Sequence, residues 1–177
     1  LFQIEKSIRM NITEEEYISM ISDKTAALIG AAAELGALSA SDKDEDRVNL
    51  RNFGENLGIA FQIHDDLLDY YGHQNIIGKP SGNDFKEKKI TLPLIHSFQK
   101  AQSGEIKRIK RMLKKGVTRK DVSYIITFAE DYGGIDYSQL KKKEYARKAK
   151  ECLLSYPDNE IRSALYSFVD YIIQRKH

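Results

Sequence analysis

Apolar residues recur every three or four positions through most of this chain, which is the spacing of one face of an α-helix. The series that runs from Leu50 through Phe53 and Leu57 to Phe61 is the clearest example. Strand-like alternation of apolar and polar residues is scarce, and the 177 residues include only 3 prolines. The pattern therefore predicts an all-α fold, and the length suits a single domain segment over residues 1–177 with one sizeable core.

The composition narrows the class of protein. A net charge of +2 gives no reason to expect a nucleic acid partner. Cys152 is the only cysteine, so an intramolecular disulfide is impossible and a reducing compartment fits. No apolar run is long enough to span a membrane, and no signal peptide is visible. We therefore expect a cytoplasmic protein with no integral membrane segment. The amphipathic opening without methionine is typical of a start inside a domain.

Turn-forming and capping residues divide the chain into helices. Thr13 and Glu16 have the spacing of a capping box, which predicts a helix start. Gly72–Lys89 is rich in turn-forming residues and is predicted to be a loop. The predicted helices extend from Thr13 to about Leu38, from about Asp46 to Tyr71, over Thr91–Ala101, around Ile106–Val117, over Thr118–Tyr132, from an Asp136 cap to about Tyr156, and from Asp158 or Asn159 onward.

One lysine lies on an apolar face of the first long predicted helix. Lys24 shares that face with Tyr17 and Ile21, and the face continues to Leu28. An unpaired ammonium is costly in such a place. Lys24 either buries its stem and keeps its charge in water, or is held at the edge of a cavity for an anionic ligand. The small residues of the segment 26–33 offer a thin surface for close helix approach.

Three aspartates, Asp65, Asp66 and Asp69, crowd the end of the next predicted helix. Helical spacing continues the apolar stripe from Phe61 to Asp65 and Asp69, with Asp66 about 100° round the helix. Partly buried like charges repel each other, and a cation between them would offset that cost. So few oxygen ligands suit Mg²⁺, which keeps positions for water or phosphate oxygens. The alternative is a solvated acidic helix face.

A basic segment follows the aspartates. Gly72–Lys89 contains Lys79 and Lys89, and it could close over a polyanion or serve as a solvated connection. An acidic cluster, a lysine on an apolar stripe and a basic loop together suit a diphosphate that Mg²⁺ bridges to the aspartates. The same cations would stabilise the charge of a departing diphosphate. Leu57 and Phe61 would suit a hydrocarbon attached to it.

Other kinds of catalytic site fit poorly. The 4 histidines show no zinc-binding spacing. No serine or cysteine has the sequence setting of a catalytic nucleophile. Gly78 and Lys79 lack the glycine spacing of a phosphate-binding P-loop.

Segments with the look of sequence motifs lie at Lys24-Thr25, Phe61–Asp69, Gly78–Phe85, Lys88–Leu94 and Tyr171–Arg175. Together they resemble the trans-isoprenyl (polyprenyl) diphosphate synthase family. Phe61–Asp69 resembles the family's second aspartate-rich motif, and Gly78–Phe85 resembles the segment that follows it. Lys88–Leu94 is similar to the K-x-T-L-P signature, and Lys24-Thr25 to the Lys-Thr pair. Tyr171–Arg175 is similar to the family's end. The resemblance covers essentially the whole chain, in the family's motif order, and looks most like the longer-chain polyprenyl synthases.

The resemblance implies roles for individual residues. Asp65, Asp66 and Asp69 would bind magnesium together with an allylic diphosphate. Lys24 and Lys79 would bind that diphosphate, and Lys89 would assist at the loop. Thr25 and Gln62 match groups thought to stabilise the allylic cation. The catalytic residues would therefore be Lys24, Thr25 and Gln62, and the cofactor Mg²⁺.

The resemblance also implies a reaction and an architecture. The family reaction is ionisation of an allylic diphosphate, attack by isopentenyl diphosphate, and loss of a proton. The fold is an all-α helical bundle of the isoprenoid synthase type, usually a homodimer. The family's first aspartate-rich motif and the arginine pair after it are absent from this sequence. We therefore expect the chain to be the C-terminal half of such an enzyme and to be inactive alone, with product length set in the other half.

Two alternatives stay open. Some family-like chains are non-catalytic partner subunits of a heterodimeric prenyl synthase, although the intact Asp65-Asp66-x-x-Asp69 with Lys24 and Lys79 argues against such degeneration. A helical scaffold whose acidic cluster is only a surface is the other alternative. A second aspartate-rich motif with two arginines encoded before Leu1 would support the enzyme, and its absence would favour the partner subunit.

Overall fold

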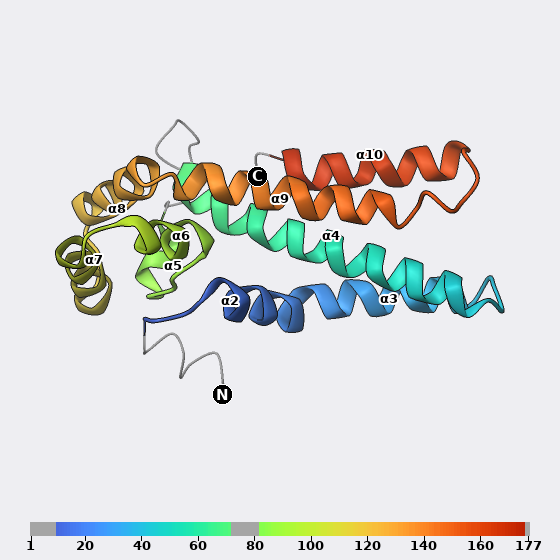
Figure 1. Ribbon diagram of the computed structural model, residues 1–177, viewed down its shortest axis with the longest axis horizontal. Coiled ribbons are helices and arrows are strands. Elements are labelled where there is room, and N and C mark those ends of the chain that lie inside the picture. The colour runs from blue at the N-terminus through green and yellow to red at the C-terminus, as the bar shows by residue number, and fades with distance from the viewer. Residues whose placement is uncertain (1–9, 72–81, 176–177) are drawn as a thin grey trace. The chain divides into compact units, whose positions relative to one another are not determined.

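The computed structural model describes residues 10–71 and 82–175, and these form helices without any strand (Figure 1). The all-α prediction is therefore confirmed. The amphipathic opening before Met10 and residue Lys79 lie outside the described residues. The elements are α2 (Glu14–Ile21), the π-helix η1 (Ser22–Ala26), α3 (Ala27–Leu38), α4 (Asp44–Tyr71), α5 (Asn83–Lys86), α6 (Leu92–Lys100), α7 (Ser103–Lys115), α8 (Arg119–Asp131), α9 (Gly134–Glu151) and α10 (Glu160–Gln174).

The helices form two compact units. The first unit comprises Leu1–Tyr17 and Asp65–Gln139, and the second comprises Ile18–His64 and Leu140–His177. Helices α2, α4 and α9 each contribute residues to both units. The sequence-based expectation of one domain segment over residues 1–177 stays a prediction. Each unit has its own buried residues and is described by itself below.

Side-chain caps fix several helix starts. The predicted capping box is confirmed, because the Glu16 N–H donates to Thr13 Oγ1 at 3.2 Å and the Thr13 N–H donates to Glu16 Oε2 at 3.1 Å. The last helix is capped by Asn159, whose Oδ1 accepts from the Arg162 N–H at 3.0 Å. The expected Asp136 cap is wrong, because α9 already begins at Gly134 and Asp136 lies inside its first turn.

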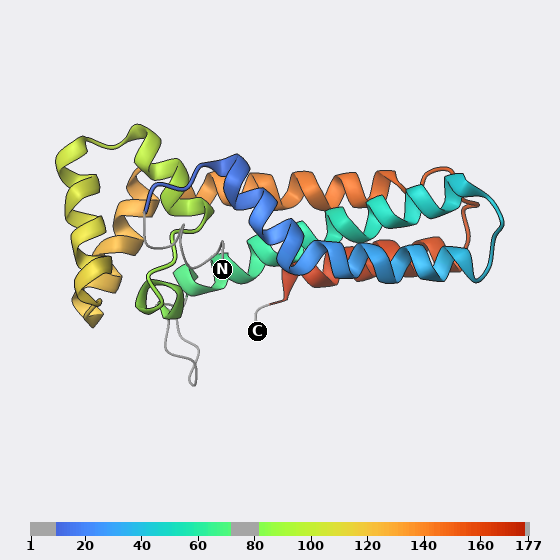
Figure 2. The same ribbon diagram turned by 90° about the horizontal axis from the view of Figure 1, so that it is seen from below.

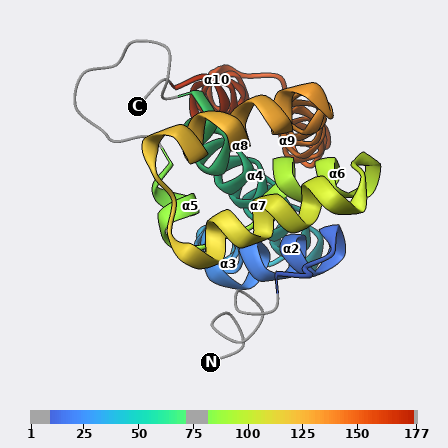
Figure 3. The same cartoon turned by 90° about the vertical axis from the view of Figure 1, so that its left-hand side faces the viewer.

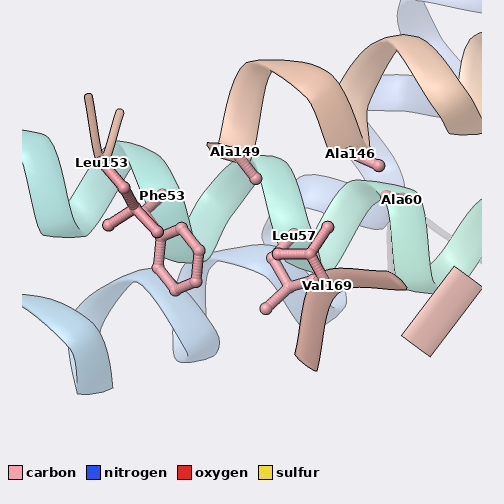
Figure 4. Packing of buried hydrophobic residues seen from close by; sticks show 7 residues of the cluster. All are labelled: Phe53, Leu57, Ala60, Ala146, Ala149, Leu153 and Val169. Carbon is pink, nitrogen blue, oxygen red and sulfur yellow. The ribbon is translucent and has the colours of Figure 1, made fainter. Parts of the chain in front are cut away.

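The core of the second unit is formed by α4, α9 and α10, which Figure 1 shows side by side. It contains Phe53, Leu57, Ala60, Ala146, Ala149, Leu153 and Val169, labelled in Figure 4. Small alanines of α9 facing α4 let the two helices approach closely. The predicted apolar stripe of the long helix is thus confirmed at Phe53 and Leu57, which are buried.

Another face of α4, which carries Gly54 and Gly58, packs against η1 and α3. These two helices run along the first half of α4 (Figure 2). A Cβ on Gly58 would lie 2.5 Å from Ala26 Cα, and one on Gly54 would lie 2.8 Å from Gly30 Cα. Only glycine at these α4 positions permits such a short distance between the helix backbones. The predicted close approach through Ala26 and Gly30 is therefore confirmed.

Gly58→Ala is expected to destabilise the protein by about 1–3 kcal/mol, because the new methyl group would push η1 away from α4. Gly36→Ala on α3 is the matched control, since no atom lies within 4 Å of its added Cβ. Alanine should there add about 0.5–1 kcal/mol of helix stability. Urea unfolding of both variants measures the difference, and equal midpoints would contradict the close contact.

The π-helix corrects one prediction from the sequence. In η1 the Ala27 N–H donates to the Ser22 carbonyl, so this turn holds one more residue than an α-helical turn. Ala26, rather than Lys24, is consequently the next buried residue after Ile21 on this face. Lys24 is exposed, and Leu28 is 75% exposed. Lys24 therefore does not lie on a buried apolar stripe.

The first unit is built around α6 and α8, with α7 against both (Figure 3). Phe98 of α6 and Phe128 of α8 have ring centroids 6.0 Å apart. Arg108 of α7 lies over the Tyr124 ring of α8, 4.2 Å from its centroid. Ile109 and Leu113, on the inner face of α7, are fully buried. Within the described residues, every helix is too short or too polar to cross a bilayer.

Candidate active site

The candidate site residues of the second unit lie where η1 approaches α4. Thr25 Oγ1 donates to Gln62 Oε1 at 3.0 Å, in a partly buried position. The Ala26–Gly58 contact next to this hydrogen bond sets how close the two helices come. Lys24, beside Thr25 on the same π-turn, keeps an exposed side chain. The structure thus brings Thr25 and Gln62 together and leaves the Lys24 ammonium accessible to a ligand.

The three aspartates lie in the first unit and differ in burial. Asp66 is 8% exposed and counts as buried, whereas Asp65 and Asp69 are half-buried. The expectation that the buried stripe continues into Asp65 and Asp69 is therefore wrong. The buried face of α4 instead includes Ile63, Asp66, Leu67 and Tyr70. Phe61 lies beside this face and is only partly buried.

Asp66 is held by a buried tyrosine. The Tyr17 hydroxyl donates to Asp66 Oδ2 at 2.7 Å, and the Tyr17 side chain is fully buried. Burial, followed by the charge and hydrogen bond of Asp66, raises the pKa of Tyr17 well above its usual value. Tyr17 is therefore a protonated donor at neutral pH, and it fixes the orientation of the Asp66 carboxylate.

Asp69 is held by the segment that begins α5. The Asp84 N–H donates to Asp69 Oδ2 at 2.7 Å, and Lys89 Nζ donates to Asp84 Oδ1 at 3.2 Å. Burial is the main cause that raises the pKa of Asp69. For Lys89, burial would lower the pKa, but hydrogen bonds and charges of Glu87 and Asp84 outweigh it and raise the pKa. Lys89 therefore stays protonated and tied to the acidic residues.

Buried contacts fix this segment. Gly82 has φ 81°, in the left-handed region that favours glycine, and it precedes α5. Phe85 is fully buried and stacks edge-on against Tyr70, with ring centroids 5.1 Å apart. Tyr70 Oη lies 3.1 Å from Thr91 Oγ1. The sequence predicted a loop over this whole stretch, whereas Asn83–Lys86 is a short helix whose first turn meets Asp69.

The donor types of this cluster fit a hard divalent cation. Carboxylate oxygens are the ligands that Mg²⁺ prefers, and the contacts from Tyr17 and the Asp84 N–H hold two of the three carboxylates in place. In the described part of the chain, no three acidic, histidine or cysteine side chains are already gathered closely enough to hold a metal ion.

Sequence reasoning missed Tyr17 and Asp84 as site residues. The helical spacing places Tyr17 on an apolar face and indicates only a packing role. Its hydroxyl is the signal that could have pointed to a polar contact, because a buried tyrosine hydroxyl needs a hydrogen-bond partner. Asp84 was one charge among several in a segment of turn-forming residues. The roles assigned to Lys24, Thr25, Gln62, Lys89 and the three aspartates stay predictions.

Comparison of the sequence with models of known protein families gives the same family as the motifs. The family model described as "Polyprenyl synthetase" matches residues 1–128, which is well over half of the chain. The chain belongs to the polyprenyl synthetase family. Membership in the polyprenyl synthetase family confirms the resemblance that the motifs indicated.

Relatives within the family include enzymes of different product length. A short chain isoprenyl diphosphate synthase of Methanothermobacter thermautotrophicus is 36% identical over 169 residues, covering 96% of this chain and 52% of that protein. The octaprenyl diphosphate synthase of Escherichia coli is 33% identical over 165 residues, covering 93% of this chain and 51% of that protein. The chain therefore spans about half the length of the curated relatives it matches.

Solved structures of the family share the fold. A geranylgeranyl pyrophosphate synthase from Bacteroides thetaiotaomicron superposes with a TM-score of 0.88 at 36% identity, covering 98% of this chain and 57% of that one. A decaprenyl diphosphate synthase from Rhodobacter capsulatus gives 0.86 at 34% identity, covering 95% and 52%. The all-α isoprenoid synthase fold is thus confirmed. The printed names of these relatives and neighbours range from a short chain isoprenyl to a decaprenyl diphosphate synthase.

Proposed function

We propose that this chain is the C-terminal half of a magnesium-dependent prenyltransferase that joins isopentenyl diphosphate to an allylic diphosphate and releases a polyprenyl diphosphate. The observation that carries the proposal is the anchoring of the aspartate cluster. Asp66 is almost fully buried and is oriented by Tyr17, and Asp69 is held by the Asp84 N–H. Burying a carboxylate costs stability, so an oriented, buried carboxylate favours a binding role over a merely solvated acidic face.

Asp65, Asp66 and Asp69 are proposed to bind Mg²⁺ together with the diphosphate of the allylic substrate. Bound Mg²⁺ would neutralise charge that develops on the leaving diphosphate. Lys24 has an exposed ammonium that can contact diphosphate oxygens, and Lys79 and Lys89 are proposed to do the same. Lys89 is held near the cluster through Asp84, at 3.2 Å.

Thr25 and Gln62 are proposed to stabilise the allylic cation. The Thr25 hydroxyl donates to Gln62 Oε1, so the negative end of the Thr25 oxygen dipole faces away from that bond. Oxygen dipoles held by the fold can stabilise positive charge without reorganising during the reaction. The Ala26–Gly58 contact holds the two helices at the distance that this pair requires.

The proposal is tested on the full-length protein that contains this chain. Labelled isopentenyl diphosphate and farnesyl diphosphate are incubated with the protein, with and without magnesium, and extractable polyprenyl product is measured. Magnesium-dependent product supports the proposal. Diphosphate binding without transfer would favour the alternative, a non-catalytic partner subunit. The homodimer and the cytoplasmic location are proposals of the same kind, and sedimentation velocity of the full-length protein tests the first.

Lys24→Met is expected to weaken binding of the allylic diphosphate about 10- to 100-fold, because a hydrogen bond between charged groups is lost. The free energy of unfolding should change by less than about 0.5 kcal/mol, because Lys24 is exposed. Lys43→Met, which removes an exposed charge of the same unit, is the matched control. Calorimetric titration measures affinity, and a loss of stability with unchanged affinity would assign Lys24 a structural role instead.

A further inference from the structure

Tyr17 donates a hydrogen bond from a fully buried side chain to one of the site aspartates. Its hydroxyl lies 2.7 Å from Asp66 Oδ2, although the two residues are 49 positions apart in the chain. The aromatic ring is fully buried, so its orientation is set by packing. The hydroxyl therefore reaches Asp66 from a fixed position, on a different helix from the aspartates.

The start of α2, which carries Tyr17, is itself fastened within the first unit. The Thr13–Glu16 capping box closes the first turn. The Tyr137 hydroxyl of α9 donates to Glu14, at 2.7 Å to Oε2 and 2.9 Å to Oε1. These contacts lie on the turn that precedes Tyr17, so they fix the axial position of its ring. The donor is thus preorganised before any ligand arrives.

A carboxylate that binds a metal needs a fixed orientation, because rotation about its side chain moves the ligand oxygens. Groups that hydrogen-bond to metal ligands supply that orientation, and removing such a group typically lowers metal affinity or activity about 10- to 100-fold. A tyrosine suits this task at a buried carboxylate, because it donates a single hydrogen bond and adds no charge. A lysine in its place would itself neutralise the carboxylate and compete with the metal.

We propose that Tyr17 is the positioning residue of the aspartate cluster: its buried hydroxyl fixes Asp66 Oδ2, so that the carboxylate is held in the orientation in which it meets the magnesium–diphosphate complex. The inference rests on the proposed function and adds a residue outside the aspartate motif to its site. Tyr17 does not touch the substrate, and it acts only through Asp66.

The experiment uses the full-length protein and compares Tyr17→Phe with Tyr132→Phe. The Tyr132 hydroxyl also donates to a carboxylate of the first unit, that of Glu105, and Glu105 has no part in the site. Calorimetric titration with magnesium in the presence of inorganic diphosphate measures affinity without turnover. Tyr17→Phe should weaken magnesium affinity about 10- to 100-fold and raise the magnesium concentration needed for half-maximal transfer. Tyr132→Phe should leave both unchanged.

A double-mutant cycle with Asp66→Asn separates positioning from general stability. If Tyr17 acts through Asp66, adding Tyr17→Phe to Asp66→Asn should cause no further loss of magnesium affinity. If Tyr17→Phe alone unfolds, the double variant can still be compared with Asp66→Asn. Asparagine carries no charge, so the double variant does not leave a buried charge without its hydrogen-bond donor. An additive further loss, or parent-like affinity in Tyr17→Phe, would overturn the inference. Absence of magnesium-dependent diphosphate binding in the parent protein would instead refute the proposed function, and this inference with it.

Discussion

Asp65→Ala in the full-length protein is expected to lower the rate of prenyl transfer by about 100- to 1000-fold. Asp65 opens the aspartate cluster and is half-buried on α4, next to the anchored Asp66. Its carboxylate is proposed to bind magnesium, and alanine supplies no oxygen in its place. The loss should appear mainly in the turnover number, because the charge that magnesium stabilises develops in the transition state.

The helix content of Asp65→Ala should stay at the parent level, since alanine favours helix more than aspartate does. Glu45→Ala removes an exposed carboxylate from the first turn of the same helix and is the matched control. It should transfer prenyl groups at the parent rate. Transfer of labelled isopentenyl diphosphate at limiting magnesium, together with circular dichroism, measures both effects. If Asp65→Ala keeps near-parent turnover under those conditions, the metal-site assignment is wrong.

The 177-residue chain by itself is expected to form no polyprenyl product. It spans about half the length of the relatives it matches, and it carries one aspartate-rich motif. Stabilisation of a departing diphosphate depends on cations that are held in place around it. One carboxylate cluster would leave part of that coordination to water, so the charge of the leaving group would be poorly stabilised.

The isolated chain should also associate or fold poorly. In the second unit, Leu28 is 75% exposed, Leu35 is 65% exposed and Ile161 is 71% exposed. Exposed apolar residues of this size favour contact with other surfaces. Incubation of the chain with magnesium, labelled isopentenyl diphosphate and farnesyl diphosphate, alongside sedimentation velocity, tests both expectations, with the full-length protein as the positive control. Robust product from the chain alone would show that its metal site is self-sufficient and would end the half-enzyme proposal.

The sequence predicts the helices well because each one is encoded locally. Thr13 and Glu16, three residues apart, cap the start of one helix. Asn159 caps the start of another by accepting a hydrogen bond from the Arg162 N–H, also three residues away. The apolar spacing of Phe53 and Leu57 is likewise a property of a single helix. The acidic cluster could be identified from the sequence for the same reason, since its members are neighbours in the chain.

The environment of the cluster could not be predicted, because it depends on contacts between distant segments. Tyr17 and Asp66 are 49 residues apart, and Asp84 reaches back 15 residues to Asp69. The placement of Lys24 on an apolar face is wrong for another reason. It follows from uniform α-helical spacing, and the amino-acid sequence of Ser22–Ala26 carries no obvious mark of a π-turn.

The π-turn has a consequence for how this part of the chain tolerates insertions and deletions. The residues up to Ile21 and those from Ala26 onward follow two helical registers that differ by one residue. Loss of one residue between Ile21 and Ala26 would turn the π-turn into an α-helical turn and leave these two residues four positions apart on one helix face. Gly30 would then still face Gly54. Lys24 and Thr25 therefore lie in a turn that can lose a residue without rotating α3, and a change in its length would alter the presentation of these two side chains more than the packing of the helix.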